Sequence, residues 1–292
     1  MKISRLLLLF LLLGLHTGLH AETGTERVHA ASSMDWPGGR FILELSYLAE
    51  DGEALSAESR QHALNMIRRE IPSRFLAEIS GLNIDSRHTI HNRIQESPFL
   101  TESLLDMSLR GETVSASFNR DFSRFTQVIR YPLYPDIISL FISHTTASPQ
   151  SAELEYVPTG PYSGIVIYAE GPLPVQGTRK SSELQPAFFP KVYNTDMETI
   201  FEVHMVDPER LRSWGPVQFI PVEEIHRAFS RVGEVPLYIH AAALFGIRTC
   251  DIVVSDRSGR QVRANDHILS LLKQGKIAVI YSSGTSSPPV KR

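Results

Sequence analysis

The chain of 292 residues has one cysteine, no excess of basic residues and no long apolar run beyond its N-terminus. The lone Cys250 cannot form an intrachain disulfide. It stands at the start of an apolar stretch, which favours a buried small side chain over a reactive thiol. The formal net charge is −3, so nucleic-acid binding has no electrostatic support.

Common catalytic motifs are also lacking. The sequence has no G-x-S-x-G nucleophile elbow, no P-loop, no dinucleotide-binding glycine pattern and no H-E-x-x-H zinc motif. Three other groups of reactive residues also lack a suitable arrangement. Neighbouring side chains on a strand point to opposite faces, which argues against a metal site at Asp85, His88 and His91 and against a catalytic pair at Ser143 and His144. The adjacent acids Glu223 and Glu224 are expected on a helix surface, where such pairs are usually solvated. We therefore expect no catalytic residues, no metal site and no cofactor, and the protein is not predicted to be an enzyme.

The N-terminus carries the pattern of a secretory signal peptide. Lys2 and Arg5 precede an unbroken apolar run over residues 6–13, and the small Ala21 follows at a suitable distance for cleavage. The run is too short for a stable membrane span, although an uncleaved anchor is the alternative. Removal of residues 1–21 leaves 27 basic and 32 acidic residues, a net charge of −5. No cysteine is placed to carry a lipid, so we expect a periplasmic or secreted protein that is not membrane-spanning after cleavage.

The length indicates about two domains, at roughly 150 residues each. A hydrophobic fraction of 42% is enough for a sizeable core, and a polar stretch near residue 145 suggests the boundary. We expect an α+β protein with two mixed α/β domains, over residues 36–145 and 152–281, and a flexible tail over 282–292. Residues 22–35 are expected to be poorly ordered. The oligomeric state is left open.

The first half combines one long helix with several strands. Ser56 is a suitable N-cap, and apolar residues then recur at spacings of three and four, at Leu64, Ile67, Ile71, Phe75 and Ile79. Pro72 predicts a kink, or two helices meeting near Ile71. Strands are expected over residues 41–48, 89–91, 113–118 and 125–131, and a helix is favoured over 137–142.

The second half is organised around residues 162–171, where β-branched and aromatic residues between glycines and prolines predict a buried strand. Residues 184–193 should lie extended against the core, with Pro186 and Pro190 framing Phe188 and Phe189. His240, in an apolar run, is expected to be a core histidine. Strands and short helices should alternate, with some parallel pairing: a hairpin over 190–203, helices from Asp207 and over 222–231 and 263–273, and strands over 217–222, 252–254 and 277–281. Residues 236–245 form an apolar run that ends at Gly246.

Several of these segments resemble a module of secreted bacterial proteins. The likeness is carried by YSGIVI at 162–167 and LQPAFFPKVY at 184–193, supported by LNIDS at 82–86 and by stretches within 232–280. The chain is similar to the lipoprotein-20 and flagellar assembly protein T group, and most similar to uncharacterised spirochaete periplasmic proteins. The resemblance covers residues 36–281 and is most specific over 160–281. It departs from the group at Tyr168-Ala169-Glu170, which stands where the group has an acid, alanine and a basic residue.

The resemblance implies an interaction role in the envelope or flagellum, with no catalytic residues to transfer. Our first hypothesis is therefore a non-enzymatic periplasmic protein that binds envelope or flagellar proteins as an assembly or structural factor. The alternative is a small-ligand or glycan-binding module that uses residues 171–177 with Tyr168, Phe188 and Phe189, although core packing also explains these aromatic residues. A periplasmic hydrolase is a third hypothesis, supported by the compartment alone.

Overall fold

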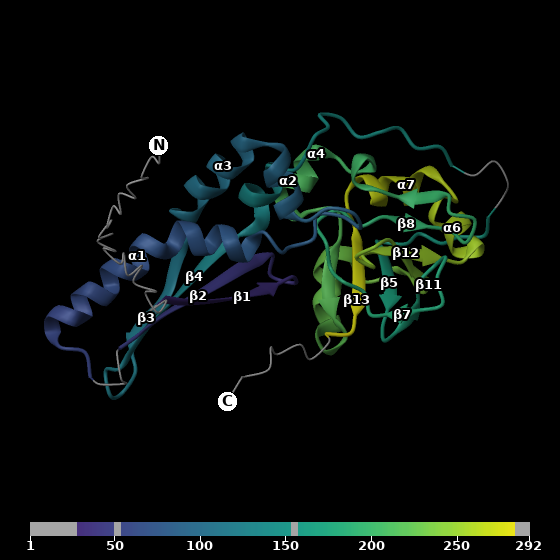
Figure 1. The fold of residues 1–292 in the computed structure, drawn as a ribbon. Helices are drawn as coiled ribbons and strands as arrows, with labels where there is room; N and C mark the ends of the chain where they lie inside the picture. Colours follow the sequence, from purple (N-terminus) through teal and green to yellow (C-terminus); the bar gives the residue numbers. More distant parts are fainter. Residues whose placement is uncertain (1–27, 50–53, 153–156, 284–292) are drawn as a thin grey trace, which may run out of the picture.

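The computed structural model describes residues 28–49, 54–152 and 157–283 (Figure 1). They form two mixed α/β domains side by side, which confirms the predicted α+β class. The predicted signal peptide over 1–21 and most of the predicted tail lie outside the described residues.

The N-terminal domain is a four-stranded antiparallel sheet covered on one face by helices. The strand order is β1-β2-β4-β3, which makes β1 and β3 the two edges. The long helix α1 packs across β1, β2 and β4, and α3 packs against α1. The elements are β1 (Val28–Asp35), β2 (Arg40–Leu48), α1 (Ala57–Ile79), α2 (Ile90–Glu96), α3 (Pro98–Ser108), β3 (Glu112–Phe118), β4 (Arg124–Pro132) and the π-helical η2 (Leu133–Ile137).

Helix α1 begins as predicted, because the Ser56 hydroxyl accepts a hydrogen bond from the Ser59 N–H at 3.1 Å. It does not divide into two helices near Ile71, since it continues through Pro72 as one element. A proline inside a helix costs about 3 kcal/mol. Ile67 and Phe75, both fully buried on either side of Pro72, offset that cost by packing on the sheet.

Two other predictions in this domain are wrong. Residues 28–35 are not a poorly ordered lead-in, because β1 pairs with β2 over its whole length of eight residues. Thr89 does not open a strand. It is the N-cap of α2, where its N–H donates to Asn92 Oδ1 at 2.9 Å and its hydroxyl accepts from the Asn92 N–H, so that a capping box starts a helix.

The C-terminal domain is a seven-stranded mixed sheet of order β10-β13-β5-β11-β12-β8-β9. The four strands β10, β13, β5 and β11 run parallel, so the predicted parallel pairing is confirmed. Its strands are β5 (Ile165–Ala169), β8 (Val192–Tyr193), β9 (Thr199–Phe201), β10 (Gln218–Pro221), β11 (Leu237–Phe245), β12 (Asp251–Val254) and β13 (Ile277–Tyr281), with a small ribbon of β6 (Leu173–Pro174) and β7 (Ser181–Ser182).

Helices cover this sheet unequally. On one face, α4 (Pro208–Trp214), α6 (Asp256–Val262) and α7 (Asp266–Lys273) close a large core, joined by η3 (Val203–Met205). The other face carries only η4 (Val222–Ala228) and α5 (Phe229–Val232), which cover a smaller cluster around Val166, Ile220 and Ala278. The sequence predicts α4 and α7 but not α6, and residues 222–231 are mostly 3₁₀-helical where an α-helix is predicted.

Candidate interaction surface

The aromatic residues predicted to bind a small ligand do not gather in one place. Phe188 and Phe189 are buried in the core of the N-terminal domain, although they belong to a loop of the C-terminal half. The segment 184–193 thus lies against a core, as predicted, but it contributes to both cores: Leu184 and Val192 pack in that of the C-terminal domain, and the two Phe rings in that of the N-terminal domain. Tyr168 lies on the C-terminal sheet, and Gly171 and Gly177 both have positive φ in a largely exposed loop.

A loop of the N-terminal domain, residues 83–86, forms backbone hydrogen bonds with the C-terminal domain. The carbonyls of Asn83 and Ile84 accept hydrogen bonds from the N–H groups of Phe188 and Phe189, at 3.0 and 2.7 Å. The Ser86 carbonyl accepts from the Arg248 N–H at 3.3 Å. Backbone bonds of this kind fix one relative placement of two chain segments.

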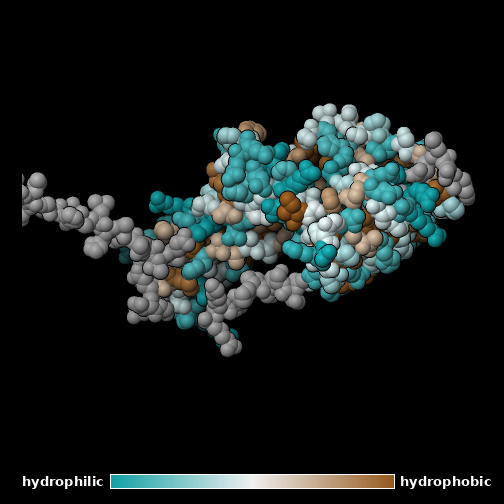
Figure 2. Space-filling view, turned by 45° about the vertical axis from the view of Figure 1, so that its right-hand side comes forward, coloured by the Kyte–Doolittle hydropathy of each residue, from teal (hydrophilic) through white to brown (hydrophobic). Residues whose placement is uncertain are grey.

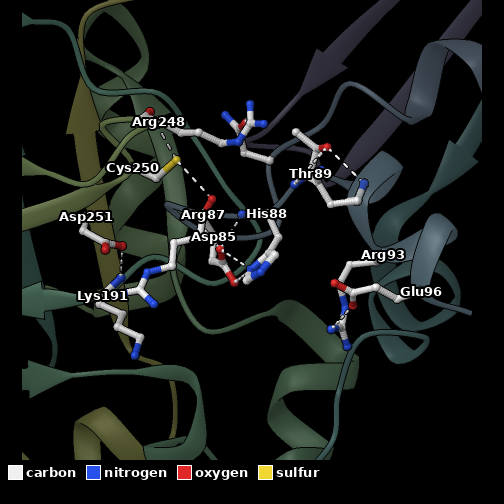
Figure 3. Close-up of polar contacts among 12 residues, drawn as sticks. Asp85, Arg87, His88, Thr89, Arg93, Glu96, Lys191, Arg248, Cys250 and Asp251 are labelled. Atoms are coloured by element: carbon white, nitrogen blue, oxygen red, sulfur yellow. Dashed lines mark hydrogen bonds and ion pairs between the residues drawn. The ribbon is translucent and has the colours of Figure 1, made fainter.

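Figure 3 shows the charged groups around this junction. Asp85 accepts hydrogen bonds from the N–H groups of Arg87 and His88, both at 2.7 Å, and pairs with His88 Nδ1 at 3.1 Å. Partial burial alone would raise the Asp85 pKa, but these hydrogen bonds and the His88 interaction hold it below its usual value. Asp85 and His88 therefore form a local contact within the loop.

On the other side of the junction, Asp251 and Cys250 are almost fully buried. Asp251 accepts a hydrogen bond from the Lys191 N–H at 2.9 Å, yet burial raises its pKa. Burial also raises the pKa of the Cys250 thiol to about 12, with a smaller contribution from Asp251. The thiol lies near the Arg248 carbonyl at 3.4 Å. Cys250 therefore occupies the buried position that the sequence predicts.

The other reactive side chains singled out from the sequence make separate local contacts. Within the described ranges, no three His, Cys, Asp or Glu side chains are placed to hold a metal ion. His91 contacts Gln95 on α2. His144 contacts the Val206 carbonyl at 3.0 Å, and Glu224 pairs with Arg227 at 2.6 Å.

The open edge of the N-terminal sheet is its most exposed element. Among the described residues, strand β3 pairs with β4 on one side only, and each residue from Glu112 to Ser117 is exposed. An edge strand presents unpaired backbone N–H and C=O groups along its free side. Proteins commonly protect such edges with Lys, Pro or a bulge. Here a register shift between Thr113 and Ser115 is present, but residues 113–118 include no charge and no proline.

Exposed apolar side chains border this edge. Leu109 precedes β3 with 71% of its side chain exposed, Val114 lies within it at 47%, and Phe122 follows at 40%. Arg60 of α1 stacks over the Phe122 ring at 4.0 Å from its centroid, which holds that ring beside the strand. We call Leu109, residues 112–118 and Phe122 the β3 edge. The face drawn in Figure 2 is mainly hydrophilic, with apolar residues in small separate groups.

A second exposed group lies on the C-terminal sheet, beyond the cover of η4 and α5. His240 stacks on Tyr168 with ring centroids 5.1 Å apart, and Tyr238 lies 6.0 Å from Tyr168. The prediction of a core histidine is wrong, because the alternation of β11 turns Leu237 and Ile239 inward and His240 outward. This pattern of alternate burial is not visible in a run where nearly every residue is apolar.

The described helices include none with the length and apolar character needed to cross a bilayer. Fold and surface thus define a two-domain α+β protein with an open sheet edge. Residues 27–140 match the family model for the N-terminal domain of Treponema pallidum Tp0624, and residues 164–283 match that for its second domain. The chain contains both domain types in this order and is related to a spirochaete protein family. No curated protein matches it.

Proposed function

We propose that the protein is a non-enzymatic cell-envelope protein that binds an extended segment of a partner protein along the β3 edge. The single observation that carries the proposal is a strand of seven residues that has no partner on its free side within the described part of the chain and whose residues 112–117 are all exposed. A partner segment that adds a strand there gains main-chain hydrogen bonds without any rearrangement of the sheet.

The side chains of β3 indicate what kind of segment would fit. The pairing with β4 places Ala116 and Phe118 on the face of α1, and Ser115 and Ser117 on the opposite face. The partner strand would therefore meet small apolar groups on one side and hydroxyls on the other. Because the centre of the strand is uncharged, an uncharged partner segment with alternating apolar and Ser or Thr residues would match it.

The backbone hydrogen bonds and buried aromatic rings that join the two domains support a structural role. A partner held by the N-terminal sheet would be linked mechanically to the C-terminal domain through Phe188, Phe189 and the Asn83–Ser86 loop. The envelope location rests on the predicted signal peptide, and the flagellum-associated role rests on the resemblance to the lipoprotein-20 and flagellar assembly protein T group. Both are part of the proposal.

The experiment is photocrosslinking in native cell envelopes from a reactive residue at Ser115, with the crosslinked partner peptide identified by mass spectrometry. The matched control carries the same group at Thr178, an exposed residue of the other domain. We expect one recurring envelope protein, linked through an extended segment, from Ser115 and not from Thr178.

A second variant tests the edge itself. Ala116→Lys places a charge on an exposed strand position and should block strand addition without unfolding the sheet. We expect it to abolish the Ser115 crosslink, whereas Thr178→Lys should leave the crosslink unchanged. Equal crosslinking from both positions, retention of the crosslink in Ala116→Lys, or crosslinks only between two copies of this chain would contradict the proposal.

A further inference from the structure

A cavity of about 230 Å³ lies between the two domains, away from the β3 edge. The N-terminal domain contributes the turn at residues 36–39 and Tyr134, and the C-terminal domain contributes residues around Trp214, Gln218 and Arg231. The turn is fixed against the second domain, because Trp36 packs on Phe219 with centroids 5.6 Å apart and Gln218 Nε2 donates to the Pro37 carbonyl at 2.9 Å. The cavity therefore exists only when the domains are joined.

Arg231 lines the cavity as a buried cation, with 5% of its surface exposed. Its guanidinium donates to the carbonyls of Trp214, Gly215 and Gly275, at 2.7, 2.7 and 2.8 Å, which caps the ends of α4 and α7. Helix ends supply only partial negative charge. No carboxylate among the described residues pairs with this cation.

A guanidinium carries five N–H donors, so three carbonyl bonds leave two donors for another acceptor. Burial lowers the pKa of Arg231 to about 10, and the nearby Tyr134 opposes this shift. Arg231 is therefore still protonated at neutral pH. The Arg231 guanidinium also stacks on Trp214, 4.7 Å from the ring centroid. The cavity thus combines a positive charge with an aromatic wall.

Gln218 supplies a second unused group. Its Nε2 is occupied by Pro37, but its Oε1 is buried and has no hydrogen-bond partner. An unpaired buried acceptor destabilises the fold because its lost hydrogen bonds to water are not replaced, and a ligand that donates a hydrogen bond would remove that cost. Ser213 and Ser230 are exposed cavity residues and mark its mouth. The cavity therefore opens to solvent beside Arg231, whereas Gln218 Oε1 is covered and meets a ligand only if its side chain turns.

We infer that this cavity binds a small hydroxycarboxylate, whose carboxylate pairs with Arg231 and whose hydroxyl donates to Gln218 Oε1 once that side chain turns toward the cavity. The volume, below the roughly 300–1,000 Å³ of pockets for drug-sized ligands, suits a molecule the size of lactate or of a single sugar acid. The flat faces of Trp36 and Trp214 would favour a ring among such ligands. The site is distinct from the β3 edge and does not depend on the proposed partner.

Intrinsic fluorescence tests this directly, because the only two tryptophans of the chain, Trp36 and Trp214, both line the cavity. The probes are lactate and glucuronate, each matched with an uncharged analogue, propane-1,2-diol and glucose, on the chain without its predicted signal peptide. We expect a saturable change below about 10 mM with at least one carboxylate, and none with the uncharged analogues.

Gln218→Leu should weaken binding of the responding carboxylate about tenfold, and Gln176→Leu, at an exposed position outside the cavity, serves as the folded comparison. Arg231→Lys should weaken it further. If Arg231→Lys does not fold, the binding measured for Gln218→Leu decides the test alone. The inference is overturned if neither carboxylate gives a saturable change, if the uncharged analogues act equally, or if Gln218→Leu binds as tightly as Gln176→Leu.

Discussion

Phe188 is the residue whose removal should most weaken the link between the domains. Its side chain is 2% exposed, lies in the core of the N-terminal domain, and contacts Trp36 and Phe141 with ring centroids 6.1 and 5.8 Å apart. A buried aromatic ring removes about 150–250 Å² from water, worth an upper estimate of about 4–6 kcal/mol at 25 cal/mol per Å². Measured Phe→Ala changes in cores cost about 3–5 kcal/mol, so we expect Phe188→Ala to lower the free energy of unfolding by that amount.

The assay is urea denaturation followed by tryptophan fluorescence, since Trp36 lies beside Phe188. Phe229→Ala is the matched control, because Phe229 is 48% exposed and should lose less than about 1 kcal/mol. If the domains are coupled through this ring, Phe188→Ala should also separate the unfolding of the two domains into distinct transitions. A cost below about 1 kcal/mol with a single unchanged transition would refute the interpretation of Phe188 as a cross-domain anchor.

Two further predictions concern the buried groups at the junction. Burial raises the Asp251 pKa above its unfolded value, so its contribution to stability is complete below the unfolded pKa and is lost as pH rises through the folded pKa. Asp251→Asn should therefore lose less stability than the natural protein as the pH rises above about 4 in urea titrations; an identical pH dependence would contradict this. The Cys250 thiol, with its pKa raised to about 12 by burial, should resist a thiol reagent at pH 8 until the protein is unfolded in urea, and stoichiometric labelling of the folded protein would show otherwise.

The sequence predicts those elements whose local signals agree with their packing. β5 and β13 are apolar runs bounded by glycine or proline, and α4 begins at Asp207-Pro208 with an N-cap and a proline at its first position. β1 is missed because His29 to Ser33 has little β propensity. It becomes a strand through its ladder with β2, which is a property of the sheet.

The candidate surfaces depend on sheet order and domain packing, which single-sequence patterns do not contain. Residues 113–118 are predicted as a strand, but only the order β1-β2-β4-β3 makes that strand an edge. The cavity joins Trp36, Tyr134, Trp214 and Arg231, which are far apart in the chain. The sequence carries one indirect signal of the domain packing: Phe188 and Phe189 stand between two prolines, in a segment on which the family resemblance rests.

The most direct test of the central claim is hydrogen–deuterium exchange of the purified protein, alone and with the partner captured from Ser115. Binding along the β3 edge should slow exchange of the free-side amides within residues 112–118, because each gains a main-chain acceptor. Protection should be absent in Ala116→Lys. Protection confined to the sheet face around Tyr168, Tyr238 and His240, with β3 unchanged, would contradict the account.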